Sequence, residues 1–208
     1  MINLNGEVGE ILFDIAERLK TEFTDKLVGC EMGVAYGGSI ETIGRLWLGR
    51  GTIYGFDTFT GHPKEIAREC EFCQLHGGVK SHAASNMDGW YDYYGRDKYA
   101  YDYIRAELDK QNLTNVILVK GLITDTTDIS FIDTLHYCFL DLDFPLSMWQ
   151  AYNLVKNKVV GYLCLHDVFP ATAMPGNFEV YEKILEENLF SVYYENRNVN
   201  YPVILKRR

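Results

Sequence analysis

The sequence predicts an α/β fold with a doubly wound, mostly parallel sheet of seven strands. Short apolar runs alternate with stretches of helical periodicity along most of the chain, and that alternation is typical of helices packed on a sheet. The apolar runs are nearly continuous, as in strands that helices cover on both faces. Near the C-terminus two strand-like runs follow each other without a helix between them, so the last edge of the sheet is expected to be antiparallel.

Each expected strand is a short apolar or β-branched run that ends at glycines or polar residues. The turn between the last two runs is expected at residues 195–198, which read ENRN. In chain order, the expected strands are 27–32, 52–56, 116–119, 135–140, 159–165, 189–194 and 201–206.

The expected helices follow from apolar side chains that recur every three or four residues. In 7–23, for example, this spacing gives one apolar stripe. Ser39 is the expected N-cap of the second helix, because its hydroxyl can accept a hydrogen bond from an unpaired backbone N–H. Gly49 and Gly51 are expected to stop that helix. In chain order, the expected helices are 7–23, 39–48, 99–111, 147–156 and 178–188.

Length and composition favour one ordinary domain. The chain has 208 residues, of which 47% are hydrophobic and 24% charged, and this argues against extensive disorder. We expect a single domain over 1–208, with an insertion at about 61–98 where the strand and helix pattern lapses. Three cysteines, Cys30, Cys138 and Cys164, lie in apolar runs and are expected to be small core residues.

Charge argues against nucleic acid as a partner. Lys and Arg number 20 against 29 Asp and Glu, which gives a net charge of −9, and a phosphate backbone would be repelled. No apolar run approaches the ~20 residues of a membrane helix, and the first nine residues do not resemble a signal peptide. The sequence therefore predicts a cytoplasmic protein without a membrane partner, and it leaves open whether the chain forms a homo-oligomer.

The first candidate site follows the first strand, where residues 31–39 read EMGVAYGGS. Glycines allow a sharp bend and a close approach of a ligand. Asp57 closes the second strand, where a carboxylate can accept hydrogen bonds from both ribose hydroxyls. The pair suggests an adenosine-containing ligand, and the G-x-G-x-x-G dinucleotide pattern is missing. The alternative is a simple glycine turn beside a solvated acid.

The second candidate site lies at two later strand ends. Asp141 and Asp143 follow the strand 135–140, and Asp167 follows the strand 159–165. Carboxylates at neighbouring strand ends can converge on one point, and such oxygen ligands suit Mg²⁺. The alternative is that these acids cap the following helices or are simply exposed at the edge of the sheet.

Five segments together resemble class I S-adenosylmethionine-dependent methyltransferases, most of all the macrocin and mycinamicin sugar O-methyltransferase family. Residues 31–39 resemble its acid-x-Gly-Val-x-x-Gly-Gly opening, and 55–63, GFDTFTGHP, resemble its Asp-Ser-Phe-x-Gly-x-Pro motif. Residues 121–126, GLITDT, are similar to its Gly-x-Phe-x-Asp-Thr segment. Residues 141–147 and 160–167 resemble its acidic motifs, Asp-x-Asp-x-Tyr-x-Ser and Gly-Gly-x-x-x-x-Asp-Asp. The resemblance implies a Rossmann-like methyltransferase fold.

The resemblance also implies roles for individual residues. Asp57 is expected on the ribose of S-adenosylmethionine. The residues expected around its methionine part are Glu31, Gly33, Gly37 and Ser39, and Asp141 is a further candidate for cofactor binding. Members of the family bind a divalent metal through such strand-end acids, so Asp141, Asp143 and Asp167 are the candidate Mg²⁺ ligands. The sequence departs from the family at His166, which replaces the first acid of a pair. This leaves open a weaker site, a different metal or none.

Methyl transfer needs a nucleophilic oxygen aligned with the methyl group and a proton acceptor near it. The expected catalytic residues are His62, which follows the second motif, His166 at a strand end, and Asp141. The expected acceptor is a hydroxyl of a small molecule, such as a sugar or a polyketide. Two alternatives stay open: a nicotinamide-dependent oxidoreductase on a similar fold, and an inactive homologue that only binds a nucleoside.

The insertion holds two further patterns. Cys70, Cys73, His76 and His82 have a spacing that can hold Zn²⁺, although the preferred interpretation places the cysteines on a helix after Pro63. Residues 90–103 contain seven aromatic side chains, which suit stacking on a sugar or aromatic acceptor. We therefore expect a lid over the acceptor, with packing onto the sheet or a dimer contact as the alternative.

Overall fold

The computed structural model describes residues 6–60, 101–169, 175–197 and 201–208. Seven strands form one sheet in the order β3-β2-β1-β4-β5-β7-β6. Five of them are parallel, and β7 pairs antiparallel with both β5 and β6. The predicted doubly wound sheet with an antiparallel C-terminal edge is confirmed. The strands are β1 (Leu27–Met32), β2 (Gly51–Asp57), β3 (Val116–Lys120), β4 (Leu135–Leu140), β5 (Val159–Leu165), β6 (Phe190–Tyr194) and β7 (Val203–Arg207).

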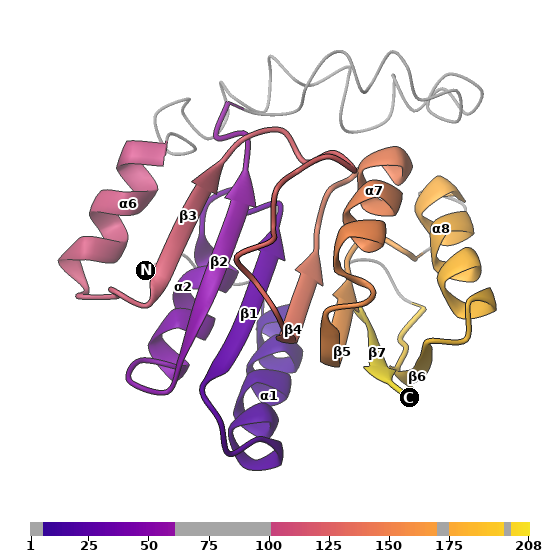
Figure 1. Ribbon diagram of the computed structural model, residues 1–208, viewed down its shortest axis with the longest axis horizontal. Coiled ribbons are helices and arrows are strands. Elements are labelled where there is room, and N and C mark those ends of the chain that lie inside the picture. The colour runs from indigo at the N-terminus through magenta and orange to yellow at the C-terminus, as the bar shows by residue number, and fades with distance from the viewer. Residues whose placement is uncertain (1–5, 61–100, 170–174, 198–200) are drawn as a thin grey trace.

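Helices cover both faces of the sheet (Figure 1). One buried cluster joins the sheet to α1, α2 and α6, and a second joins the opposite face to α7 and α8. The three predicted core cysteines are buried and free. No helix in the described ranges is long and apolar enough to span a membrane. The helices are α1 (Gly6–Glu22), α2 (Gly38–Leu46), α6 (Tyr101–Lys110), α7 (Pro145–Val155) and α8 (Pro175–Glu186).

The prediction for the start of α2 is wrong. Its N-cap is Gly37, which has a φ of 80°. Ser39 lies one residue inside the helix, and its hydroxyl donates to Glu31 Oε1 at 2.5 Å instead of capping the helix. The glycine is preferred at the cap because this left-handed backbone strains residues that carry a Cβ.

The start of α7 also differs from the prediction. The helix begins at Pro145 rather than at residue 147, because proline at the first helical position has the required φ and lacks only an N–H that has no partner there.

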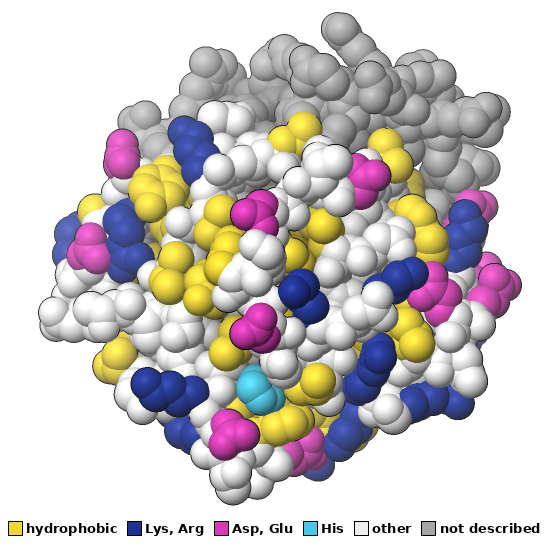
Figure 2. Space-filling model, viewed as in Figure 1, with side chains coloured by type: hydrophobic (Ala, Val, Ile, Leu, Met, Phe, Trp, Pro, Cys, Tyr) yellow, Lys and Arg dark blue, Asp and Glu magenta, His cyan; other side chains and the backbone are white. Residues whose placement is uncertain are grey.

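No helix connects β3 to β4. The connection, residues 121–134, crosses the sheet as a loop whose isoleucines pack into the core. Ile117 on β3 and Phe131 in this loop are therefore 41% and 52% exposed. Figure 2 shows hydrophobic side chains gathered on this face, beside the part that α7 and α8 cover.

Candidate cofactor and acid–histidine site

The candidate residues meet at one edge of the sheet because four parallel strands end level with one another. Met32, the last residue of β1, pairs with Phe56 of β2 and with Leu140 of β4, and Leu140 pairs with Leu165 of β5. The residues that follow these strands therefore share the carboxyl edge, where ligands bind in open α/β sheets.

Gly33 turns the chain at this edge in the way the sequence predicts. Its φ is +96°, and an added Cβ would lie 1.8 Å from the backbone oxygen of Asp141. Its N–H donates to the carbonyl oxygen of Phe56 at 2.9 Å. The close contact at Gly33 is thus with the backbone of Asp141, the residue after β4. Glycine is therefore required here whether or not a ligand binds.

Asp57 holds the glycine-rich loop through its carboxylate. The backbone N–H groups of Val34 and Ala35 donate to Oδ2 at 2.8 and 3.0 Å, and that of Phe59 donates to Oδ1 at 2.7 Å. The carboxylate is therefore bonded to its own loops and is not simply solvated. Ribose hydroxyls would have to share these oxygens with the loop or displace its N–H groups.

Glu31 lies beneath the same loop and is almost fully buried, with 1% exposure. Ser39 donates to Oε1, whereas Oε2 has no partner among the described residues. Burial raises the pKa of this carboxyl well above its usual range, the serine hydrogen bond opposes that rise, and the charges of Asp141 and Asp57 add to it. None of the described residues therefore uses the acceptor capacity of Oε2.

The second group forms at the ends of β4 and β5, as predicted, but with a different membership. Asp141, His166 and Asp167 each offer one ligand atom, and these atoms lie within 4.8 Å of one another. His166 Nδ1 is 3.0 Å from Asp141 Oδ1 and 3.3 Å from Asp167 Oδ2. The backbone fixes both strand ends, because the N–H of Asp141 donates to Met32 and that of His166 donates to Leu140, each at 2.9 Å.

The two carboxylates control the charge of His166. Burial lowers the pKa of the imidazole, but Asp141 and Asp167 together outweigh burial and hold this pKa well above its usual range. The two acids therefore favour the protonated imidazole, which balances their charge, and a metal ion bound between the three side chains would take the place of the proton on Nδ1.

The donor set does not fit Mg²⁺, the ion that the sequence resemblance implies. Mg²⁺ requires near-octahedral oxygen ligands, and here an imidazole nitrogen stands between two carboxylate oxygens. Asp143 is not a member of the group. It lies beyond the end of β4 with a φ of 54°, because the strand stops at Leu140 and the chain turns before α7. The spacing of Asp141 and Asp143 would place them on one face of an extended strand, but β4 ends at Leu140, so neither residue is in the strand.

Several predicted residues lie outside the described part of the chain. They are His62, the possible zinc ligands Cys70, Cys73, His76 and His82, and most of the aromatic residues of 90–103. The role of the Val34 and Ala35 N–H groups could not be predicted from the sequence, since backbone donors carry no side-chain pattern.

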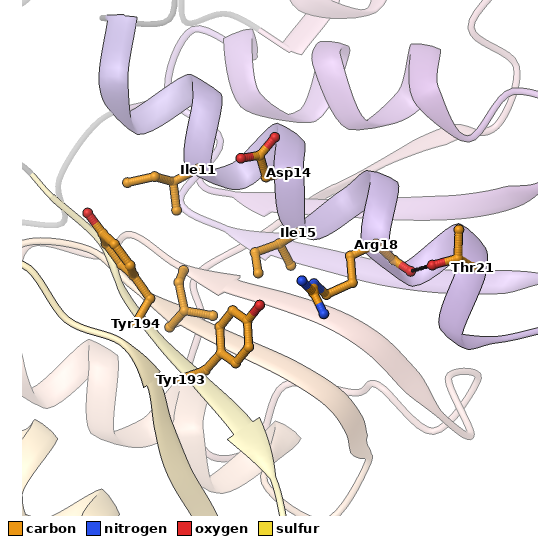
Figure 3. A pocket seen from close by; sticks show the side chains of 8 residues that line it. Ile11, Asp14, Ile15, Arg18, Thr21, Tyr193 and Tyr194 are labelled. Carbon is orange, nitrogen blue, oxygen red and sulfur yellow. Dashed lines mark hydrogen bonds between the residues drawn. The ribbon is translucent and has the colours of Figure 1, made fainter.

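A pocket of about 550 Å³ lies elsewhere, between α1 and the strands β6 and β7. Figure 3 shows that Arg18 and Tyr193 face each other across it, and the guanidinium carbon lies 5.4 Å from the ring centroid. None of the candidate site residues lines this pocket, so it is separate from the carboxyl edge of the sheet.

Solved structures show the same fold. No protein-family model matches the sequence, and no curated protein matches it. The O-methyltransferase NovP is 19% identical, with a TM-score of 0.68 over 96% of this chain and 78% of that chain. The calicheamicin methyltransferase CalS11, also described as a TDP-rhamnose 3'-O-methyltransferase, is 17% identical, with a TM-score of 0.62 over 99% and 80%.

An O-methyltransferase from Bacillus cereus in complex with SAH is 13% identical, with a TM-score of 0.62 over 99% of this chain and 83% of that chain. At these identities the likeness establishes the fold. The predicted Rossmann-like methyltransferase fold is confirmed.

Proposed function

We propose that the protein is an S-adenosylmethionine-dependent O-methyltransferase that acts on a hydroxyl of a small molecule. The observation that carries the proposal is the meeting of the glycine loop, Asp57 and the Asp141–His166–Asp167 group at one edge of a methyltransferase fold. The O-methyltransferases NovP and CalS11, which share that fold, support the choice of oxygen as the methyl acceptor.

The cofactor assignment uses groups that already face the glycine loop. Asp57 accepts the ribose hydroxyls, in exchange for part of its bonding to the Val34 and Ala35 N–H groups. Glu31 accepts a hydrogen bond from the methionine ammonium through Oε2, the atom without a partner in the described structure. A bound cation favours the ionised carboxylate, so binding would reverse the rise in the Glu31 pKa.

The chemical step is an in-line displacement at the methyl carbon. The acceptor oxygen forms a bond to the methyl group, the bond from carbon to sulfur breaks, and the bonding pair stays on the sulfur of S-adenosylhomocysteine. As the oxygen gains its third bond, its proton becomes strongly acidic, so a carboxylate suffices to remove it. We assign that role to Asp141, and His166 holds the carboxylate in place through the contact at 3.0 Å.

The acceptor is proposed to be a small hydroxylated molecule, such as a sugar or a polyketide. CalS11 is described as acting on TDP-rhamnose, and the net charge of −9 disfavours a nucleic acid acceptor. The single-domain organisation, the lid at 61–98, the base His62, a cytoplasmic location and a homo-oligomer stay predictions from the sequence. Deletion of residues 64–98 tests the lid, and it should abolish methyl transfer while cofactor binding persists.

Calorimetric titration of the full chain with S-adenosylmethionine, S-adenosylhomocysteine and NAD tests the cofactor. We expect saturable binding of the first two and none of NAD. Binding of NAD alone would replace the proposal with the oxidoreductase alternative. Asp109→Ala, at an exposed acid on α6, is a matched control that should leave affinity unchanged.

Transfer of a labelled methyl group to a panel of nucleotide-linked and glycosylated acceptors tests catalysis. Binding of S-adenosylhomocysteine without transfer to any member of the panel would favour the inactive, nucleoside-binding homologue. Loss of transfer in Asp141→Asn, measured at saturating S-adenosylmethionine, is the result expected if Asp141 accepts the proton.

A further inference from the structure

The acid–histidine group, Asp141, His166 and Asp167, has the geometry of a small ion site. One atom from each residue lies within 4.8 Å of the other two. All three side chains are partly or largely shielded, with exposures of 31%, 18% and 16% in that order. The group is therefore not a set of freely solvated surface charges.

The orientation of His166 is the second observation. Nδ1 is fully buried, and no acceptor in the described structure is aligned with it as a hydrogen bond requires. It nevertheless lies within 3.3 Å of both carboxylates. A nitrogen directed between two acceptors, and aligned with neither, is placed as a ligand of an ion that all three residues share.

The position is held by the fold. The backbone N–H groups of Asp141 and His166 each complete the ladder of a neighbouring strand at 2.9 Å. The ring of Phe139 packs edge-on against the imidazole, with 6.0 Å between centroids. The imidazole therefore does not need to move far to become a ligand.

We propose that Asp141, His166 and Asp167 bind a first-row transition-metal dication in preference to Mg²⁺. Imidazole suits Zn²⁺, Fe²⁺ and Co²⁺, whereas Mg²⁺ selects sites made of oxygen. A single residue, His166, sets this preference, because an aspartate at its position would give three carboxylates. The inference deepens the proposed function, but it depends only on the donor atoms, so metal binding and methyl transfer can fail separately.

The test uses Co²⁺, whose visible spectrum reports its ligands. The full chain is titrated with Co²⁺ and with Mg²⁺ by calorimetry and, for Co²⁺, by absorption. We expect one saturable Co²⁺ site with nitrogen and oxygen ligands and an affinity at least about 100-fold above that for Mg²⁺. In His166→Asp we expect that ratio to fall at least about 10-fold.

Two further variants keep the test decisive. Asp141→Asn should weaken the binding of Co²⁺ and of Mg²⁺ to a similar degree, since it removes one charged oxygen but not the nitrogen. The ratio of the two affinities should therefore stay unchanged. A Cys70→Ser, Cys73→Ser double variant should retain the Co²⁺ site, and a thiolate-to-cobalt absorption band would assign the ion to the cysteines instead. Circular dichroism confirms that each variant is folded.

Three results would overturn the inference. They are no saturable Co²⁺ binding, an equal preference in the wild type and His166→Asp, or loss of the site in the cysteine variant. In the first case the imidazolium itself balances the two acids and no metal is needed. Titration of the same samples with S-adenosylhomocysteine separates the proposals, because failure to bind it overturns the methyltransferase assignment but leaves a Co²⁺ result standing.

Discussion

The two halves of the candidate site satisfy their charges in different ways. On the β1 and β2 side, the Asp57 carboxylate is held by three backbone N–H groups of its own loops. On the β4 and β5 side, Asp141 and Asp167 are held by the side chain of His166. The first arrangement depends on backbone conformation and tolerates few changes. The second depends on one side chain and can be altered by one substitution.

The largest expected effect concerns Gly33, on the β1 and β2 side of the site. Gly33→Ala should destabilise the protein by about 3 kcal/mol or more, because it adds a Cβ 1.8 Å from the Asp141 carbonyl oxygen at a φ of +96°. Denaturant unfolding measures the loss.

The matched control for that variant is Gly49→Ala. Gly49 also has a positive φ, of +75°, but nothing lies within 4 Å of an added Cβ. Gly49→Ala should lower the free energy of unfolding by only about 1 kcal/mol. Equal losses in both variants would mean that the left-handed backbone, and not the approach of β4, makes Gly33 necessary.

The next effect concerns Asp57. Asp57→Ala should weaken S-adenosylmethionine binding by about 100-fold, or about 2.7 kcal/mol, because it removes the ribose acceptor and also releases the N–H groups of Val34 and Ala35. Calorimetry measures the affinity. An unchanged affinity in a folded variant would show that Asp57 only anchors the loop.

Glu31 feels the charges of Asp57 and Asp141, one from each half of the site, and it offers a pH-dependent test. Its pKa is raised on folding, so the neutral acid is the stable form in the folded protein. The contribution of Glu31 to stability is therefore fully present below about pH 4, the pKa of an unfolded glutamate, and is lost as pH rises through the folded pKa.

Glu31→Gln should remove this loss, with about 1.4 kcal/mol gained at alkaline pH for each unit by which the pKa is raised. Unfolding at pH 4 and pH 8 measures the difference. Ser39→Ala is the opposite control, since it removes the hydrogen bond to Oε1 and should destabilise the protein more at pH 8 than at pH 4. A Gln variant without any gain at pH 8 would place the ionised carboxylate in a better-solvated site than its 1% exposure indicates.

The smallest effect is expected at Asp143, on the β4 and β5 side of the site. Asp143 lies outside the group of converging ligand atoms, so Asp143→Asn should change Co²⁺ affinity less than about 3-fold, whereas Asp141→Asn should reduce it by at least about 10-fold. A comparable loss in both variants would restore Asp143 as a ligand and support the original set of three aspartates.

Much of the fold was readable because its elements obey local rules. Apolar runs gave all seven strands, to within two residues at most boundaries. The errors fall where local rules compete, as at α2, where Gly37 and Ser39 are both acceptable caps. There Ser39 donates to the buried carboxyl of Glu31, and Gly37 is the N-cap. A contact between residues eight positions apart therefore decided which residue caps the helix.

The sequence by itself determined the sheet, its antiparallel edge and the strand ends at which Asp57, Asp141, His166 and Asp167 stand, because hydrophobic periodicity and strand length are local properties. Only the tertiary structure decided which of these side chains meet. The level ends of β1, β2, β4 and β5 bring Gly33 against Asp141 and place His166 between two acids. Distances of about 3 Å between residues more than twenty positions apart depend on strand register, which no local pattern specifies.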